Sequence, residues 1–460
     1  MSKEHLHFLG ISGHAMRSLA LSAREQGSTV TGADAGAYPP GSDWLDEHDF
    51  TWWREWNPAH LAGVTKVILT GSIAPDNPEV SEAQKRGIPV LSFAEYVGSQ
   101  TASAHSIVVA GTHGKTTTSS LLAWIFQCAG ENPDYLIGIT PHNFETSVRL
   151  RGMPLVILEG DEYRASQLEK VSKFSYYHPD VLLVTNVEFD HPDFFSDISD
   201  VCQRFDDLIG SMPPEGRIIT HAGVELSQAT HERVTERYDS APGSAQWWAE
   251  SVEYHEKGLS FAVYFRGDFL TEIDIPLYGK HNVANTVGAI AVASGEGIAL
   301  EVIRDACRTF QGATRRFSRV SKEGDAVTVL DDYAHHPTEI AATLNAAAAH
   351  FDGRVIALFR PHTFSRTAAL LPDYKAAFES ATAVVIPPIE GARESMASSD
   401  VSSSDVAAVV GKRAVAPADR ETVIEAVVSA AQPGDVVISM TVNGYEKCAE
   451  EIALRLREKF

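Results

Sequence analysis

The chain has 460 residues, of which 44% are hydrophobic and 22% are charged, and its formal net charge is −23. These proportions are ordinary for a folded globular protein, and the length allows about two to four domains with cores of their own. The excess of 61 acidic over 38 basic residues argues against general binding to nucleic acid or to anionic membranes. A site for an anionic ligand must therefore be a local basic patch.

The spacing of the cysteines and the hydropathy of the chain indicate the cellular compartment of the protein. The cysteines Cys128, Cys202, Cys307 and Cys448 lie far apart and form no CxxC pair. This argues against zinc or a disulfide framework and favours reduced thiols. The first residues lack a long apolar run, and no run of about twenty apolar residues occurs, so we expect no signal peptide and no membrane span. The sequence predicts a cytoplasmic protein.

The chain begins with a predicted β-α-β unit. Strands are expected at residues 5–9 and 28–32, and Asp34 follows the second strand. The turn after the first strand carries Gly10 and Gly13 but has Met16 where a full GxGxxG pattern has its third glycine. Its backbone N–H groups can hold a nucleotide diphosphate. A nicotinamide-binding domain would begin in the same way, with the acid on a ribose.

A phosphate-binding loop is predicted at residues 107–118. An apolar strand ends in Gly111 and Gly114, and Lys115, Thr116 and a helix-like segment follow. In such a loop, backbone N–H groups face phosphates, the lysine neutralises the β and γ oxygens, and the hydroxyl reaches Mg²⁺. The full eight-residue pattern has glycine where this chain has Val109. The stretch 100–106 just before the loop is small and polar and predicts a linker.

Acidic residues follow the next two apolar strands. Residues 155–158 precede Glu159 and Asp161, and residues 181–184 precede Asp190 and His191. The carboxyl ends of parallel strands are where such sheets bind ligands, so these side chains can hold metal beside Thr116. Helix capping is the alternative for each cluster.

The second half of the chain predicts an antiparallel β excursion within 215–275 and then an Ala-rich helix. Asn282 and Asn285 lie on one face of that helix. Asparagine is unfavourable inside a helix without a partner, so the pair is expected to bind a ligand or a neighbouring loop. From about residue 312, strands and helices alternate again, which predicts another doubly wound sheet.

Six motifs occur in order: GTHGKTTT, EGDE, NVEFDH, GKHNVAN, RRF and DDYAHHPTE. In this combination the chain resembles the Mur ligases of peptidoglycan assembly over nearly its whole length. The resemblance implies an α/β fold of three domains. These are an N-terminal Rossmann-like domain that binds a UDP-sugar (1–100), a central P-loop ATPase with a mostly parallel sheet and a small antiparallel excursion (101–312), and a C-terminal Rossmann-like domain that binds the acceptor (313–460).

The implied activity is ATP-dependent amide ligation with two Mg²⁺ ions. The turn at residues 10–16 and the histidine-bearing clusters are similar to the branch that acts on UDP-N-acetylmuramate. The lactyl carboxylate of that substrate would attack the γ-phosphorus of ATP, and an amine would open the resulting acyl phosphate. The implied partners are UDP-N-acetylmuramate and an amino-acid or peptide acceptor, without nucleic acid or membrane, and the protein is expected to be a monomer or weak dimer.

Two acceptors stay open. Residues 34–40, 143–150, 162–163 and 170–174 are similar to family members that attach the tripeptide L-alanyl-γ-D-glutamyl-meso-diaminopimelate. Residues 360–367 are similar to members that attach L-alanine, except that Thr363 stands where those members usually have arginine. We expect the tripeptide, with L-alanine as the alternative. A nicotinamide-dependent dehydrogenase is a distant alternative that leaves the lysine loop unexplained.

The resemblance also implies roles for particular residues. Catalytic roles fall to Lys115, His191, Asp332, His335 and His336. Nucleotide binding falls to Gly111, Thr112, His113, Gly114, Lys115, Thr116, Thr117, Asn282, Asn285, Arg316 and Asp332. The UDP-sugar would contact Gly10, Ser12, Gly13, His14, Ala15, Met16, Asp34 and Ser72, the acceptor Tyr333, His336 and Arg366, and metal Thr116, Glu159 and His191. Other Mur ligases hold a metal with a carbamylated lysine, but residues 192–211 contain no lysine.

Overall fold

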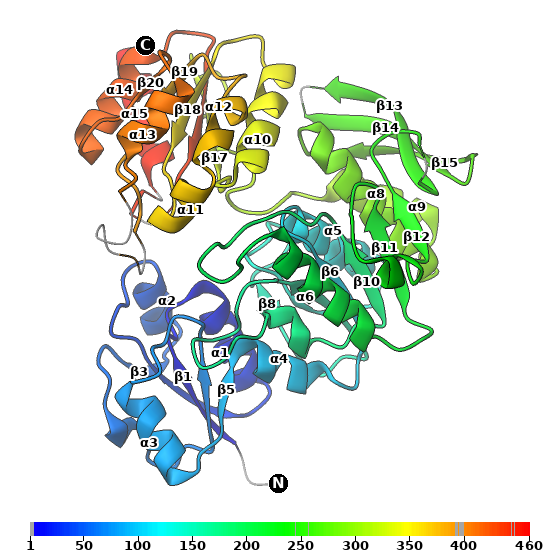
Figure 1. Cartoon of the computed structure of the whole chain (residues 1–460), viewed down its shortest axis with the longest axis vertical. Helices are drawn as coiled ribbons and strands as arrows, with labels where there is room; N and C mark the ends of the chain where they lie inside the picture. The colour runs from blue at the N-terminus through cyan, green and yellow to red at the C-terminus, as the bar shows by residue number, and fades with distance from the viewer. Residues whose placement is uncertain are drawn as a thin grey trace.

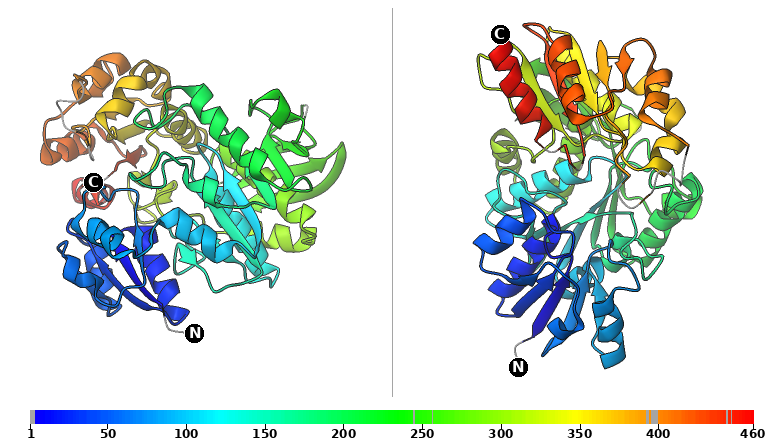
Figure 2. Two further views of the ribbon diagram at one scale, coloured as in Figure 1. Left: turned by 60° about the horizontal axis from the view of Figure 1, so that its bottom comes forward. Right: turned by 90° about the vertical axis from the view of Figure 1, so that its left-hand side faces the viewer.

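The computed structural model describes residues 4–460 except 244, 256, 392–393, 395–399, 443 and 446. The described residues form three β-sheets that follow one another along the chain, each flanked by helices (Figure 1). The right-hand view of Figure 2 places the N-terminal part at the bottom, the C-terminal part at the top and the central part between them. Among the described residues, no helix is both long and apolar enough to cross a membrane.

The N-terminal sheet has five parallel strands in the order β3-β2-β1-β4-β5. Its central strand is buried, with Leu6 and Phe8 at 0% exposure on one face and His7, bonded to Thr31 and Glu79, on the other. Asn77 caps one helix, and Gly87 ends that helix with a left-handed φ of 69°. The elements are β1 His5–Leu9, α1 His14–Glu25, β2 Thr29–Ala33, α2 Gly41–Glu47, β3 Thr51–Trp53, η1 Pro58–Leu61, β4 Lys66–Leu69, α3 Pro78–Arg86, β5 Val90–Ser92 and α4 Phe93–Thr101.

The central sheet has ten strands in the order β15-β14-β13-β12-β11-β10-β6-β9-β7-β8. Strands β10, β6 and β9 are parallel and lie side by side, so their carboxyl ends bring the phosphate loop and both acidic clusters to one edge. The elements are β6 His105–Ala110, α5 Lys115–Cys128, β7 Asp134–Leu136, β8 Val148–Arg149, β9 Leu155–Gly160, η2 Lys173–Tyr176, β10 Val181–Val184, α6 Ile198–Ser211, β11 Arg217–His221, α7 Gln228–His231, β12 Glu236–Tyr238, β13 Trp247–His255, β14 Gly258–Phe265, β15 Asp268–Ile275, α8 Lys280–Gly295 and α9 Leu300–Thr309.

The C-terminal sheet has six strands in the order β16-β17-β21-β18-β19-β20, of which only β16 is antiparallel to its neighbour. The elements are β16 Ser318–Arg319, β17 Thr328–Asp332, α10 Pro337–His350, β18 Val355–Phe359, α11 Phe364–Ala369, η3 Leu371–Asp373, α12 Tyr374–Ala377, β19 Ala383–Val385, α13 Ser403–Val410, β20 Ala414–Val415, α14 Arg420–Ala430, β21 Val436–Met440 and α15 Cys448–Lys459. These sheets confirm the predicted α/β fold with its small antiparallel portion.

Two predicted segments differ in the structure. The expected linker at 100–106 is instead the end of α4, a short turn and the start of β6. Its small polar residues predicted a loop, but Ser92 caps α4 with a capping box, and Thr101 packs at 7% exposure. Within the expected antiparallel excursion, β11 and β12 continue the parallel sheet, and only β13, β14 and β15 are antiparallel.

The three parts are joined in different ways. Buried apolar residues form one continuous cluster across the N-terminal and central sheets, and the Ser22 hydroxyl of α1 donates to the Leu150 carbonyl at 2.7 Å. The clusters around the C-terminal sheet contain residues of the C-terminal part alone. Its contacts with the central part include charged and polar pairs such as Arg366 with Asp190 and Thr338 with Glu188. A polar interface of this kind is typical of domains that move relative to each other.

Candidate active site

The phosphate loop joins β6 to α5 and depends on two glycines. Gly111 and Gly114 have φ values of 140° and 79°. A Cβ on Gly114 would meet the Asn285 Oδ1 at 2.5 Å, and one on Gly111 would collide with the Thr185 hydroxyl. The loop is therefore held against α8 and the end of β10, with its N–H groups at the N-terminus of α5 as a phosphate site requires.

A cavity of about 770 Å³ opens beside this loop, between the central and C-terminal parts. Its volume lies within the range of about 300–1,000 Å³ that is usual for small-molecule sites. The cavity brings together many of the predicted nucleotide residues, namely His113, Gly114, Thr116, Thr117, Asn282, Asn285, Arg316 and Asp332. Gly111, Thr112 and Lys115 belong to the same loop but are not among the lining residues.

The two asparagines support each other on α8. The Asn285 amide donates to the Asn282 Oδ1 at 3.0 Å, and the Asn282 amide donates to the Tyr278 carbonyl at 2.8 Å. Both side chains are 8% exposed at the wall of the cavity. On the opposite side, Asp332 accepts from the backbone N–H groups of Ala334 and Phe317 at 2.7 Å each. Asp332 thereby holds in place the backbone at the start of the C-terminal part, next to Arg316.

Lys115 lies under the loop rather than in open solvent. Its Nζ donates to the Gly111 and Thr112 carbonyls at 2.5 and 3.1 Å and to Glu162 Oε2 at 2.7 Å. Burial opposes the charge of Lys115, but Glu162 and Asp161 outweigh it and raise its pKa. Lys115 is therefore a fixed cation at the place where phosphate charge would arrive.

Carboxylates gather next to Lys115. Glu159 Oε1 accepts from the Thr116 hydroxyl at 2.9 Å, and Glu159 Oε2 accepts from the Gly138 N–H at 2.7 Å. Beside them, one ligand atom each of Asp161, Glu162 and His191 lies within 4.8 Å of the others. Burial raises the pKa of Glu162 to about 7 despite Lys115, and its Oε1 is buried without a hydrogen-bond partner.

These donors fit Mg²⁺. Hydroxyl and carboxylate oxygens are the ligands that this ion prefers. The unpartnered Oε1 of Glu162 points to a cation that the neighbouring side chains alone do not supply. His191 adopts a φ of 55°, a strained conformation that is uncommon outside glycine and is found at functional sites. Thr116 and Glu159 form one candidate position, and His191 with Asp161 and Glu162 forms the other.

The histidines after β17 face the central part. The His335 Nδ1 lies 2.8 Å from the Tyr333 carbonyl, and burial together with Arg366 lowers the pKa of His335 to about 4. His336 caps α10 by accepting from the Thr338 N–H, and its Nε2 lies 3.3 Å from the Phe189 carbonyl. His335 is therefore neutral at pH 7, and His336 lies at the contact between the two parts.

Arg366, the predicted acceptor clamp, lies buried in an ion pair with Asp190. Its side chain is 4% exposed, and Nε and Nη2 donate to Asp190 Oδ1 and Oδ2 at 2.7 and 2.8 Å. Since the planar fork of the guanidinium is occupied, an acceptor carboxylate would have to displace Asp190. Tyr333 lies 5.8 Å below the Arg316 guanidinium and is not among the residues that line the cavity.

The predicted UDP-sugar residues form a braced turn in the N-terminal part. Ser12 donates to Asp34 Oδ2 from both its backbone N–H and its hydroxyl, and Gly10 has a φ of 80°. His14 Nε2 contacts the hydroxyl of Thr140 in the central part at 2.9 Å. Ala15 and Met16 start α1, and Ser72 lies exposed in the turn after β4. Asp34 thus holds the turn, so its carboxylate is already engaged.

Sequence reasoning missed several acidic residues of this region as site residues. Glu162 contacts Lys115, Glu188 lies 3.6 Å from His113, and Glu339 lies 3.2 Å from the other nitrogen of the same ring. Each occurs in a motif that was recognised, EGDE, NVEFDH and DDYAHHPTE. Glu339 also completes a capping box with His336 at the start of α10, so it serves both the helix and the site.

The chain is similar to known proteins along most of its length. The chain matches the models of the "Mur ligase family, catalytic domain" at residues 5–105, the "Mur ligase middle domain" at 109–293 and the "Mur ligase, glutamate ligase domain" at 315–441. It is 32% identical to a UDP-N-acetylmuramate–L-alanine ligase of Caldanaerobacter subterraneus subsp. tengcongensis, over 97% of each chain.

Two solved structures are similar. A UDP-N-acetylmuramate–alanine ligase of Thermotoga maritima has a TM-score of 0.81 at 22% identity, over 99% of this chain and all of its own, which shows the shared fold. A UDP-N-acetylmuramate:L-alanyl-γ-D-glutamyl-meso-diaminopimelate ligase of Neisseria meningitidis is 31% identical with a TM-score of 0.62, over 68% of this chain and all of its own. The chain therefore belongs to the Mur ligase family, as predicted, and is an ATP-dependent acid–amino-acid ligase of peptidoglycan synthesis.

Proposed function

We propose that this ligase joins the lactyl carboxylate of UDP-N-acetylmuramate to the amine of L-alanine. The observation that carries the choice of acceptor is the match to a UDP-N-acetylmuramate–L-alanine ligase, which runs over 97% of each chain and includes the C-terminal part. In the family, that part binds the incoming amine. The tripeptide expected from the sequence becomes the second candidate.

The first chemical problem is repulsion between two anions, the lactyl carboxylate and the γ-phosphate. Lys115 supplies a fixed cation, and Thr116 with Glu159, and His191 with its acidic neighbours, would hold Mg²⁺, which neutralises phosphate oxygens when bound. Because the pKa of Glu162 is raised to about 7, this carboxyl can take up a proton when Lys115 turns from it to a phosphate.

The second problem is deprotonation of the amine that attacks the acyl phosphate. His335 is neutral at pH 7 because its pKa is lowered to about 4, so it can accept a hydrogen bond from the amine and orient it, but its low basicity does not let it hold the amine's proton. If its Nδ1 donates to the Tyr333 carbonyl, 2.8 Å away, its Nε2 carries the free lone pair. His362, whose ring centre lies 6.3 Å away, is neutral as well, since burial and His335 lower its pKa to about 3.

The third requirement is exclusion of water from the acyl phosphate. Arg316 and Asp332 reach the cavity from the C-terminal part, and Lys115 and Asn285 belong to the central part. The nucleotide site is complete only when these two parts are closed on each other, so closure would assemble the site and shield it together.

The tripeptide is the second candidate because of one local feature. The segment before β10 contains η2, and Lys173 at its start pairs with Asp161 of the acidic cluster at 2.5 Å. Residues 170–174 of this segment are similar to tripeptide-adding members of the family, and the Neisseria structure is 31% identical. The segment therefore links a tripeptide-like stretch of sequence to the centre of the candidate site.

An acceptor screen decides between them. The protein is incubated with ATP, Mg²⁺, UDP-N-acetylmuramate and either L-alanine or the tripeptide, and ADP release and product mass are measured. We expect the L-alanine adduct, with a higher kcat/KM for L-alanine than for the tripeptide. A product with the tripeptide alone would reverse the acceptor, and no ADP with either acceptor would refute the proposal. Lys85→Ala, at a lysine side chain that is 79% exposed, is the matched control for Lys115→Ala.

A further inference from the structure

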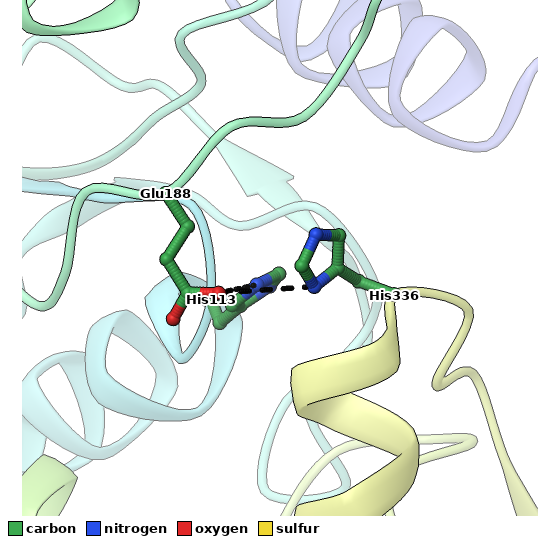
Figure 3. A group of neighbouring side chains, drawn as sticks. All are labelled: His113, Glu188 and His336. Carbon is green, nitrogen blue, oxygen red and sulfur yellow. Dashed lines mark ion pairs between the residues drawn. The ribbon is translucent and has the colours of Figure 1, made fainter. Parts of the chain in front are cut away.

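Three side chains converge at the contact between the central and C-terminal parts (Figure 3). His113 comes from the phosphate loop, Glu188 from the loop after β10, and His336 from the start of α10. Glu188 Oε2 lies 3.6 Å from His113 Nε2 and 3.8 Å from His336 Nδ1, and one ligand atom of each residue lies within 4.8 Å of the others. His113 Nε2 is buried and makes no hydrogen bond.

The outer nitrogens of both rings already have acceptors. His113 Nδ1 lies 3.2 Å from Glu339 Oε1, and His336 Nε2 lies 3.3 Å from the Phe189 carbonyl. A ring that donates through its outer nitrogen has a lone pair on its inner nitrogen. The inner nitrogen of His113 makes no hydrogen bond, and that of His336 accepts only the Thr338 N–H at 3.3 Å, a bond that a metal ion would replace. A histidine that binds metal is oriented in this way, by a carboxylate or a carbonyl on its other nitrogen.

The carboxylate of the cluster is oriented as well. The Asn186 amide donates to Glu188 Oε1 at 3.1 Å, and the Thr338 hydroxyl donates to Glu188 Oε2 at 2.6 Å. These contacts hold both oxygens of Glu188 in place. Each of the three ligand groups is therefore held by further residues, which come from both the central and the C-terminal part.

We propose that His113 Nε2, His336 Nδ1 and Glu188 Oε2 form a binding site for one divalent transition-metal ion, such as Zn²⁺ or Co²⁺. Two imidazoles and one carboxylate suit such ions better than Mg²⁺, which prefers oxygen ligands. Metal–nitrogen bonds of about 2.0–2.1 Å in a tetrahedron place neighbouring ligands about 3.3 Å apart. The two separations from Glu188, 3.6 and 3.8 Å, therefore need to shrink by about 0.3–0.5 Å on binding, and the two imidazole nitrogens, which lie within 4.8 Å of each other, would also move closer.

This site is separate from the predicted magnesium positions, since none of its ligands belongs to them. His113, Glu188, Thr338 and Glu339 line the nucleotide cavity, so the remaining coordination position would open toward the nucleotide. Because the ligands come from two parts of the chain, a bound ion would also hold those parts together. The proposal does not depend on which acceptor the ligase uses.

His113 is coupled to the two carboxylates beside it. Burial opposes a charge on His113, but Glu339 and Glu188 outweigh it and raise its pKa to about 9. Metal binding at histidine ligands competes with protons, so Co²⁺ binding at this site should strengthen as pH rises.

Co²⁺ is the probe that tests the site. The full-length protein is titrated with Co²⁺ in excess Mg²⁺ and without nucleotide, and visible absorption and calorimetry report the ligands and the stoichiometry. We expect one Co²⁺ per chain with nitrogen ligation. His336→Asn removes the imidazole but keeps a good N-cap for α10, and we expect it to weaken binding by about 100-fold or more. Glu339→Gln should weaken binding by about 10–100-fold, as loss of an outer partner does.

Two controls separate this site from others. His178→Gln alters an exposed histidine, and His191→Ala removes the other candidate cluster; both should keep the Co²⁺ signal. The proposal is overturned if the unaltered protein has no saturable Co²⁺ site, if His336→Asn binds as tightly as the unaltered protein, or if His191→Ala removes the signal. If His336→Asn does not fold, Glu188→Gln decides in the same way.

Discussion

The ion pair between Arg366 and Asp190 gives a sharp test of how the central and C-terminal parts close. Its two hydrogen bonds measure 2.7 and 2.8 Å, and the two side chains are 4% and 6% exposed. Burial opposes both charges, but His191 and then Arg366 lower the pKa of Asp190, and Asp190 raises the pKa of Arg366. We predict that Arg366→Met shifts the protein toward an open arrangement while the C-terminal sheet stays folded.

The size of the shift follows from the burial of the pair. Removal of one partner of a buried ion pair costs about 3–5 kcal/mol, because the other charge stays buried and unpaired. If the two parts separate, the unpaired Asp190 carboxylate becomes hydrated, so the lost free energy appears as a shift in the equilibrium between closed and open molecules. At about 1.4 kcal/mol for each tenfold change, the ratio of closed to open molecules should fall by roughly 100- to 4,000-fold.

Small-angle X-ray scattering with ATP analogue and UDP-N-acetylmuramate measures closure, and steady-state kinetics measures turnover. We expect a larger radius of gyration and a lower kcat for Arg366→Met. Arg354→Met is the matched control, because Arg354 also makes a two-point pair, with Asp435, but it lies within the C-terminal part and is 41% exposed. That control should change stability by only about 0–1 kcal/mol and leave closure unchanged.

A double variant separates the pair from other effects of Arg366. Asp190→Asn in the Arg366→Met background removes the stranded charge and should recover part of the closed population. If Arg366→Met leaves both the radius of gyration and kcat unchanged, the pair does not hold the two parts together, and the reasoning is refuted.

Three further predictions concern single sites. Lys115→Ala should lower kcat by about 10²–10³-fold or more in protein that remains folded, because the γ-phosphate loses its fixed cation; retained turnover would remove Lys115 from the mechanism. Thr116→Val should raise the Mg²⁺ concentration that gives half-maximal activity, since a metal ligand is lost at nearly constant volume, and an unchanged Mg²⁺ dependence would contradict that assignment. Glu79→Gln should destabilise the N-terminal part by about 1–3 kcal/mol in thermal or denaturant unfolding. Burial alone would raise the pKa of Glu79, but the hydrogen bonds from His7 and from the Asn57 N–H lower it, so its contribution is complete above the unfolded pKa of about 4.3 and is lost as pH falls through the lower folded pKa. The stability difference between Glu79→Gln and the unaltered protein should therefore shrink below about pH 4, and a difference that grows with acid would contradict this assignment.

Local features of the site could be predicted from the sequence, because they depend on residues close together in the chain. The phosphate loop needs glycines at 111 and 114 with positive φ, followed by the lysine and hydroxyl that start α5, and the sequence shows all of these in one stretch. Polar residues at the ends of apolar strands predicted the edge of the sheet where they meet, because parallel strands end together.

Contacts between distant parts of the chain could not be predicted in this way. Arg366 and Asp190 are 176 positions apart, and nothing in the sequence around either residue indicates that their side chains form an ion pair. Arg366 therefore looked free for an acceptor carboxylate. The short polar stretch at 100–106 was misread for a related reason, because helix α4 depends on its capping box and on packing against the central part rather than on composition.

Transfer of oxygen from substrate to phosphate tests the central claim most directly. UDP-N-acetylmuramate labelled with ¹⁸O in its lactyl carboxylate is incubated with ATP, Mg²⁺ and L-alanine, and the released inorganic phosphate is analysed by mass. If the carboxylate attacks the γ-phosphorus beside Lys115 and L-alanine then opens the acyl phosphate, one ¹⁸O atom appears in phosphate for each amide formed. Amide and ADP formed with unlabelled phosphate would show that no acyl phosphate forms, and would contradict the account.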